Sequence, residues 1–152
     1  SKLGLNVTIL RLFNVYGPNQ NLKNLRQGMI SIYLAQLLKS NTIIVKGSLK
    51  RFRDFIYIDD VVKILDLCSK KKITKNKTYN VSTGQKTTVK KIISHITKIT
   101  KKKIKIIVKK STPGDQFGIY SKPYSLKKDL HIRNFTSLKD GITKMIDSIK
   151  YD

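Results

Sequence analysis

The chain has 152 residues, 39% of them hydrophobic, which is enough apolar material for a packed core and excludes wholesale disorder. The 32 basic and 9 acidic residues give a net charge of +23. A single cysteine, Cys68, excludes an internal disulfide and a cysteine-based zinc site. No apolar run approaches the roughly 18 residues that cross a bilayer, so we expect a cytoplasmic chain without membrane contact. Because the sequence does not begin with Met, we expect its natural start to lie upstream.

The positive charge makes nucleic acid the first partner to consider, because such a field attracts any polyanion. However, the basic residues are 27 Lys and only 5 Arg, and interfaces that read bases rely on Arg. The lysine clusters at 70–72, 101–103 and 109–110 flank predicted elements and form no separate tail. We therefore favour a solvated, lysine-rich surface, and a basic nucleic-acid-binding protein remains the alternative.

In the first half of the chain, the pattern predicts strands and helices in alternation. A β-branched strand over 6–11 leads to a turn at Gly17-Pro18, and a polar loop covers 19–24. Helical spacing of apolar residues predicts a helix over 27–39, followed by strands over 42–45 and 54–58. Asp59 or Asp60 is expected to cap the next helix. The apolar face of this helix consists of Val61, Ile64, Leu65 and Cys68.

The second half continues the alternation with a strand over 78–81 and a turn over 82–86. Thr87 or Thr88 is expected to cap a helix with the apolar face Val89, Ile92, Ile93, Ile96 and Ile99. A strand over 104–108, a loop over 111–120 and a short helix after Pro123 follow. Thr136 or Ser137 caps the last helix. The strands over 7–10 and 78–81 look buried on both faces, as in a parallel sheet, and two strands are too few for such a sheet. We therefore expect a missing partner domain.

Common catalytic and cofactor motifs are absent from the sequence. No two glycines lie three residues apart, so the core of a dinucleotide fingerprint is missing, and there is no G-K-[ST] phosphate loop. His95 and His131 lack acidic companions at metal-ligand spacing, so no metal site is predicted. Tyr124 and Lys128 match the Y-x-x-x-K spacing of a catalytic pair, but about one such match is expected by chance.

Three segments carry candidate binding residues. Asn14 follows a buried strand, where open α/β sheets bind ligands, although it could equally bond its own turn. Arg53 begins a strand and could grip a phosphate through two parallel bonds, or form an ordinary surface pair with an aspartate. The turn Thr112-Pro-Gly-Asp115 could contribute to a site or only reverse the chain.

Taken in order, these segments resemble the C-terminal half of extended short-chain dehydrogenase/reductase enzymes, and in particular NAD-dependent nucleotide-sugar epimerases and dehydratases such as UDP-glucose 4-epimerase. The resemblance spans essentially the whole chain. It is carried by Arg11-Leu-Phe-Asn-Val-Tyr-Gly-Pro18, Arg53-Asp-Phe-Ile-Tyr-Ile-Asp-Asp60, Tyr79-Asn-Val-Ser-Thr-Gly84, Pro113-Gly-Asp115 and Thr136-Ser-Leu-Lys-Asp-Gly141.

The resemblance implies an α/β fold in which this chain contributes two late strands of a Rossmann-type parallel sheet plus a small α/β substrate domain. Residues 1–152 would then be the C-terminal, substrate-binding portion, without the N-terminal NAD-binding part. By the same resemblance, Phe13 and Asn14 lie near the NAD nicotinamide, Asn14 and Arg53 bind the diphosphate of a UDP-sugar, and Leu22–Ile30 lies near the nucleobase. The full-length enzyme would be a homodimer.

The family's Gly-rich cofactor loop and catalytic Y-x-x-x-K both precede the segment that this chain matches. The resemblance therefore implies that no catalytic residue lies in this chain and that the isolated chain is inactive; a non-catalytic remnant that binds sugar nucleotides is the alternative. One departure concerns the phosphate site. The family often has an arginine where this chain has Thr112, and Lys109 or Lys110 is a candidate for the same anion.

Overall fold

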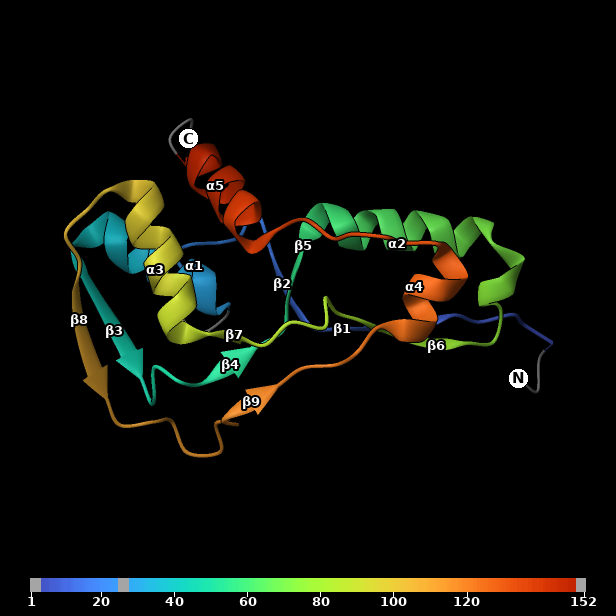
Figure 1. The fold of residues 1–152 in the computed structure, drawn as a ribbon, viewed down its shortest axis with the longest axis horizontal. Coiled ribbons are helices and arrows are strands. Elements are labelled where there is room, and N and C mark those ends of the chain that lie inside the picture. Colours follow the sequence, from blue (N-terminus) through green and yellow to red (C-terminus); the bar gives the residue numbers. More distant parts are fainter. Residues whose placement is uncertain (1–3, 25–27, 150–152) are drawn as a thin grey trace.

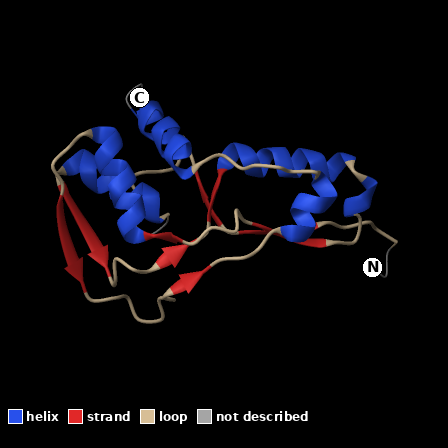
Figure 2. Ribbon diagram, in the orientation of Figure 1, coloured by secondary structure: helices blue, strands red, loops and turns tan. Residues whose placement is uncertain are grey.

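A computed structural model describes residues 4–24 and 28–149 and shows helices and strands in alternation (Figures 1 and 2). The strands are β1 Ile9–Leu12, β2 Asn14–Tyr16, β3 Thr42–Lys46, β4 Phe52–Arg53, β5 Phe55–Tyr57, β6 Thr78–Val81, β7 Thr87–Thr88, β8 Lys105–Lys109 and β9 Gly118–Ile119. The helices are α1 Met29–Lys39, α2 Ile58–Lys70, the 3₁₀ turn η1 Lys72–Thr74, α3 Val89–Thr100, α4 Tyr124–Leu130 and α5 Leu138–Ile149.

Strand pairing is mostly parallel and joins segments that are distant in the sequence. β1 pairs with β6, β2 with β5 and β3 with β8, all parallel. β4 lies between antiparallel β7 and parallel β9. In Figure 1, β2 and β5 run between one group formed by α1, α3, α5, β3 and β8 and another formed by α2, α4, β1 and β6. This arrangement is the expected α/β architecture with parallel strands.

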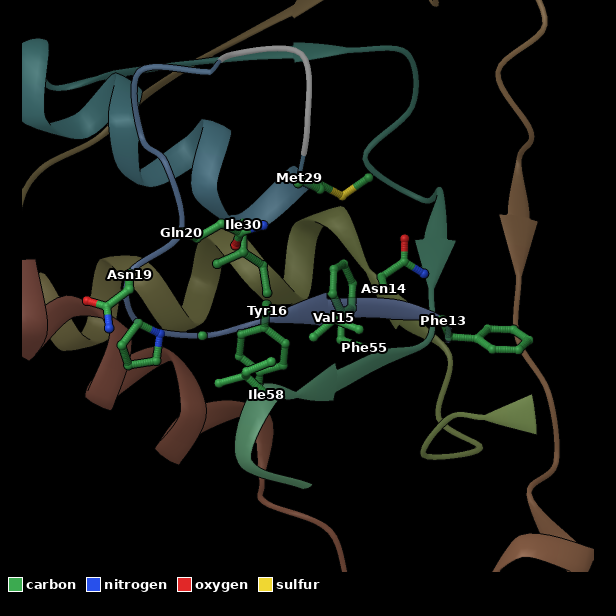
Figure 3. Close-up of a pocket in the computed structure, with 13 residues that line it drawn as sticks. Phe13, Asn14, Val15, Tyr16, Asn19, Gln20, Met29, Ile30, Phe55 and Ile58 are labelled. Atoms are coloured by element: carbon green, nitrogen blue, oxygen red, sulfur yellow. The ribbon is translucent and has the colours of Figure 1, made fainter. Parts of the chain in front are cut away.

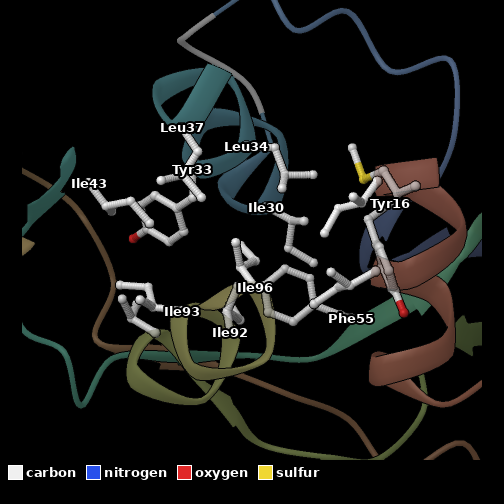
Figure 4. Packing of buried hydrophobic residues seen from close by; sticks show 14 of the residues in the cluster. Tyr16, Ile30, Tyr33, Leu34, Leu37, Ile43, Phe55, Ile92, Ile93 and Ile96 are labelled. Atoms are coloured by element: carbon white, nitrogen blue, oxygen red, sulfur yellow. The ribbon is translucent and has the colours of Figure 1, made fainter. Parts of the chain in front are cut away.

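The larger core lies between α1, α3, α5 and the strands β3 and β5 (Figure 4). Its members include Ile30 from α1, Ile92 from α3 and Ile142 from α5, each exposed by 1% or less. Full burial of such a side chain contributes roughly 1.5–3 kcal/mol of favourable transfer free energy. The predicted apolar face of α3 lies in this core. Thr88 caps the helix as predicted, because its hydroxyl accepts the N–H of Lys91 at 3.2 Å.

The smaller core lies where α2 and α4 cover one face of the β1–β6 pair. It contains Ile64 from α2, Leu126 from α4, and Tyr79 and Val81 from β6. The side chain of Ile9, which points to the opposite face of β1, is 52% exposed. The strand over 7–10 therefore carries an exposed apolar face within this chain, and its burial on both faces depends on the partner domain that the sequence predicts.

Several local predictions differ from the structure. The N-cap of α2 is Tyr57, and neither Asp59 nor Asp60 caps it, because both lie in the first helical turn. Asp60 instead accepts the N–H of Thr136 at 2.8 Å, which ties α2 to the segment before α5. Leu65 is 51% exposed and does not join the buried face of α2. The expected loop over 111–120 contains β9, and the strand β2 was not predicted. Gln27, expected at the start of the first helix, lies outside the described residues.

In the described part of the chain, no helix combines the length and the apolar character that a membrane span requires.

Candidate functional site

The candidate site is a cavity of about 540 Å³ where β2 leads into the loop before α1 (Figure 3). It is lined by residues 13–20, the first residues of α1 with Gly28 before them, and Phe55 and Ile58 from the neighbouring segment. The hydroxyl of Ser31 is hydrogen-bonded to Oε1 of Gln20, so the loop is held against α1. A polar loop thus closes one side of a cavity whose other side is largely apolar.

Phe13 and Asn14 both line this cavity, as expected for residues after β1. The backbone N–H of Phe13 donates to the carbonyl oxygen of Val81 at 3.1 Å. The backbone N–H and the side-chain Nδ2 of Asn14 both donate to the carbonyl oxygen of Asp54, at 3.1 and 2.9 Å. Asn14 is therefore bonded to a neighbouring strand and not to its own turn. Among the described residues its Oδ1 atom has no donor, so this oxygen can accept a hydrogen bond from a ligand.

Tyr16 is the ionisable residue that lines this cavity from β2. Its ring meets those of Phe55 and Tyr57 edge-on, with ring centres 6.1 and 5.7 Å away. Burial raises the pKa of Tyr16 far above the ordinary tyrosine value, and the nearby Asp60 carboxylate raises it further. The phenol therefore stays protonated at neutral pH, which argues against a role as a general base.

Asp54 is a buried structural carboxylate that sequence reasoning treated only as a possible partner of an arginine. It is fully buried. One carboxylate oxygen accepts the N–H and the hydroxyl of Thr83 at 2.8 and 2.7 Å, and the other accepts the N–H groups of Gly84 and Ser121 at 2.9 and 3.4 Å. Asp54 therefore joins the β4–β5 segment to the segments after β6 and β9, and it fixes the residues on either side of it.

Arg53 does not line the cavity; its guanidinium points toward the loop between β8 and β9. Its Nη1 donates to the carbonyl oxygen of Phe52 at 2.8 Å, and its Nη2 pairs with Asp115 at 2.9 Å. Burial lowers the pKa of Arg53, and the nearby charge of Arg51 lowers it further. Arg53 thus pairs with an aspartate, as one of the two interpretations of the sequence expected, and this aspartate, Asp115, is 62 positions away in the sequence. The Thr112–Asp115 turn consequently does more than reverse the chain.

The remaining sequence candidates lie apart from this region. Tyr124 is 71% exposed on α4 and does not line the cavity. His95 is half-buried on α3, and burial followed by the charge of Lys91 lowers its pKa. Burial raises the pKa of the Cys68 thiol, which fits an unreactive, partly packed cysteine. Within residues 4–24 and 28–149, no group of three His, Cys, Asp or Glu side chains could hold a metal ion.

The fold is that of an α/β protein with parallel strand pairs and a cavity beside the parallel strand β2. The model of the NAD dependent epimerase/dehydratase family matches residues 1–82, and the chain belongs to this family. An uncharacterized UDP-glucose epimerase of Bacillus subtilis is 32% identical over 143 residues, which are 94% of this chain and 44% of that protein. The resemblance drawn from the ordered segments is therefore confirmed.

Solved structures show the same relationship. The UDP-glucose 4-epimerase of Thermotoga maritima, solved with UDP-glucose, is 28% identical, with a TM-score of 0.90 over 97% of this chain and 47% of that chain. The UDP-glucuronic acid 4-epimerase of Bacillus cereus, in complex with UDP-glucuronic acid and NAD, is 27% identical, with a TM-score of 0.84 over 95% and 45% of the respective chains. The Rossmann-type epimerase fold predicted for this chain is thus confirmed.

The chain spans about half the length of the curated relatives that it matches, between 44% and 47% of the first three.

Proposed function

We propose that this chain is the substrate-binding half of an NAD-dependent nucleotide-sugar epimerase or dehydratase, and that it binds the diphosphate of a UDP-sugar. The family membership supports the reaction class. The UDP-sugars bound to the two similar solved enzymes support the substrate class. A non-catalytic protein that binds sugar nucleotides would use the same residues, so catalysis and binding are tested separately.

The observation that carries the proposal is the link from Asn14 through Asp54 to Arg53. The Asp54 carbonyl accepts two hydrogen bonds from Asn14, while its buried carboxylate is held by four donors. Arg53 is the next residue in the chain. A single fixed residue therefore positions the Asn14 amide beside the cavity and directly follows Arg53, whose guanidinium points toward Asp115. The second hydrogen of the Asn14 NH₂ group, which does not bond the Asp54 carbonyl, and a guanidinium are suitable donors for phosphate oxygens.

The cofactor and the missing half are part of the proposal. Bound NAD would supply reversible hydride transfer chemistry to the sugar. Phe13 and Asn14 both line the cavity, and we assign these two residues to the contact with the nicotinamide. The N-terminal NAD-binding half would cover the second face of β1, where the side chains of Val7 and Ile9 are 48% and 52% exposed. The complete enzyme would be a cytoplasmic homodimer, and the isolated chain would be inactive.

Titration calorimetry with UDP tests the substrate site. Replacement of Arg53 by alanine should weaken binding by about 1.5–3 kcal/mol, or roughly 10- to 100-fold, because a charge-assisted contact is lost. Arg133→Ala removes the same charge from an exposed position and is the matched control. Equal binding by the native and Arg53→Ala proteins would exclude Arg53 as a phosphate ligand. Binding of random duplex DNA that weakens steeply with salt would favour the nucleic-acid alternative instead.

A further inference from the structure

Arg51 and Arg53 are placed on the same side of the chain at the start of β4. Residues two apart in an extended segment point in the same direction. Arg51 precedes β4, but its carbonyl oxygen accepts the N–H of Val89 at 2.9 Å, so the extended pairing of this segment continues through it. The chain therefore presents two neighbouring guanidinium groups where the sequence comparison drew attention to one.

Both guanidinium groups pair with the same carboxylate. Nη2 of Arg53 lies 2.9 Å from Oδ1 of Asp115, and Nη1 of Arg51 pairs with the other oxygen, Oδ2. One negative charge thus bridges two positive charges, and the local excess is one positive charge. An anion with two phosphates carries more charge and more acceptor oxygens than a carboxylate, so it would satisfy this pair of donors better.

Arg51 is not fully satisfied by its present partners. Its side chain is 9% exposed. Its buried Nε atom has no hydrogen-bond acceptor among the described residues, and its Nη1 atom meets only the Asp115 carboxylate. Arg51 lies near Tyr33 of α1, and its guanidinium lies against Gly47, so its position is fixed from behind. A buried guanidinium with unused donors is unfavourable unless a further acceptor can reach it.

Asp115, in contrast, lies on an exposed loop. Residues 110–117, between β8 and β9, are all exposed. The turn is held locally by the Asp115 N–H, which donates to the carbonyl oxygen of Thr112 at 3.1 Å. Gly114 has a φ of +76° and open space around it, so the tip of the loop is not packed against the body. The two arginines are held by strands and α1, whereas their carboxylate partner is carried by a surface turn.

We infer that Arg51 is the second guanidinium of the diphosphate site, and that Asp115 occupies the position of the anion until a diphosphate displaces it. This inference rests on the proposed function, since the ligand is the diphosphate of the nucleotide sugar. Arg51, directly before β4, would also provide the second phosphate contact that Thr112 cannot make, in place of Lys109 or Lys110.

Titration of the full 152-residue chain with inorganic pyrophosphate and with UDP, at physiological ionic strength, tests the inference. Asp115→Asn should bind both ligands about tenfold more tightly, because the competing charge is gone, and Arg51→Gln should bind them about tenfold more weakly. Asp66→Asn and Arg133→Gln make the same charge changes at exposed positions and should stay within about twofold of the native chain. Thermal melts check folding, and Arg51→Lys keeps the charge if Arg51→Gln unfolds.

The possible results separate this inference from the proposed function. If Arg51→Gln binds like the native chain while Arg53→Gln binds weakly, Arg51 is not a ligand and the proposed function stands. If Arg51→Gln unfolds, Arg51→Lys takes its place in this comparison. If Asp115→Asn binds more weakly than the native chain, Asp115 orients the arginines and does not compete with the ligand. If neither the native chain nor Asp115→Asn binds pyrophosphate or UDP, the diphosphate site itself is refuted.

Discussion

Replacing Asp54 by asparagine tests the residue on which the arrangement of the candidate site depends. The substitution keeps the shape of the side chain but turns one acceptor oxygen into an NH₂ group. Oδ1 can still accept from the N–H and hydroxyl of Thr83. The new NH₂ group would face the N–H groups of Gly84 and Ser121, which lie 2.9 and 3.4 Å from Oδ2. Two partly buried donors would then lose their acceptor.

The expected cost follows from these distances. A buried donor without a partner costs about 1–3 kcal/mol, and the loss of a charged acceptor weakens the two remaining bonds as well. Because the Ser121 contact is long, it counts for less, and we expect the free energy of unfolding to fall by about 2–4 kcal/mol. Urea denaturation followed by circular dichroism measures this loss as a lower midpoint at unchanged slope.

Asp66→Asn is the matched control, because it removes the same charge from an exposed i,i+4 pair with Lys70, whose nitrogen lies 2.7 Å away. Such a pair contributes about 0.3–0.5 kcal/mol. If Asp54→Asn costs no more than Asp66→Asn, the carboxylate does not hold the three segments together, and the argument that it positions Asn14 and Arg53 fails.

Two further predictions concern packing and pH. Lys77 and the Tyr79 hydroxyl each donate to Asp129 at 2.7 Å and lower its pKa. Because the folded pKa lies below that of the unfolded chain, this stabilisation should be complete above about pH 4 and lost as the pH falls through the folded pKa. The unfolding free energies of native and Asp129→Asn proteins should therefore converge in acid; a gap that is constant between pH 7 and pH 3 would contradict this. Gly141 lies in α5 against Tyr16, and an added Cβ would overlap the tyrosine ring and hydroxyl. Gly141→Ala should lower the melting temperature, because overpacking costs about 1–3 kcal/mol against the gain of up to about 1 kcal/mol in helix propensity. Ser94→Ala, at an exposed position of α3, is the control, and an equal or higher melting temperature for Gly141→Ala would show that the helix shifts freely.

Local signals in the sequence were sufficient for the helices. The spacing of Val89, Ile92 and Ile96 predicted the buried face of α3, and Thr88 was one of the two expected caps. Ser137 was one of two expected caps for α5, and its hydroxyl accepts the N–H of Asp140 at 3.1 Å. These features depend on residues three or four positions apart, so the sequence alone contains them.

The order of short motifs was sufficient for the family, which the family model and the solved structures confirm. It was not sufficient for the short strands. β2 has three residues and β9 has two, too few for an alternating pattern to distinguish them from the loops around them. The apolar residues on both sides of β1 do not by themselves show which side this chain covers, and the structure places α2 and α4 on one of them.

The sequence by itself determined the α/β class, the helix faces, two of the helix caps and the residues through which the chain resembles its family. The tertiary structure decided which of those residues meet. Asn14 bonds a residue 40 positions away, and Arg53 pairs with an aspartate 62 positions away. The physical reason is that helix periodicity and capping depend on neighbours in the sequence. Hydrogen bonds between distant segments, in contrast, form only after packing has brought those segments together.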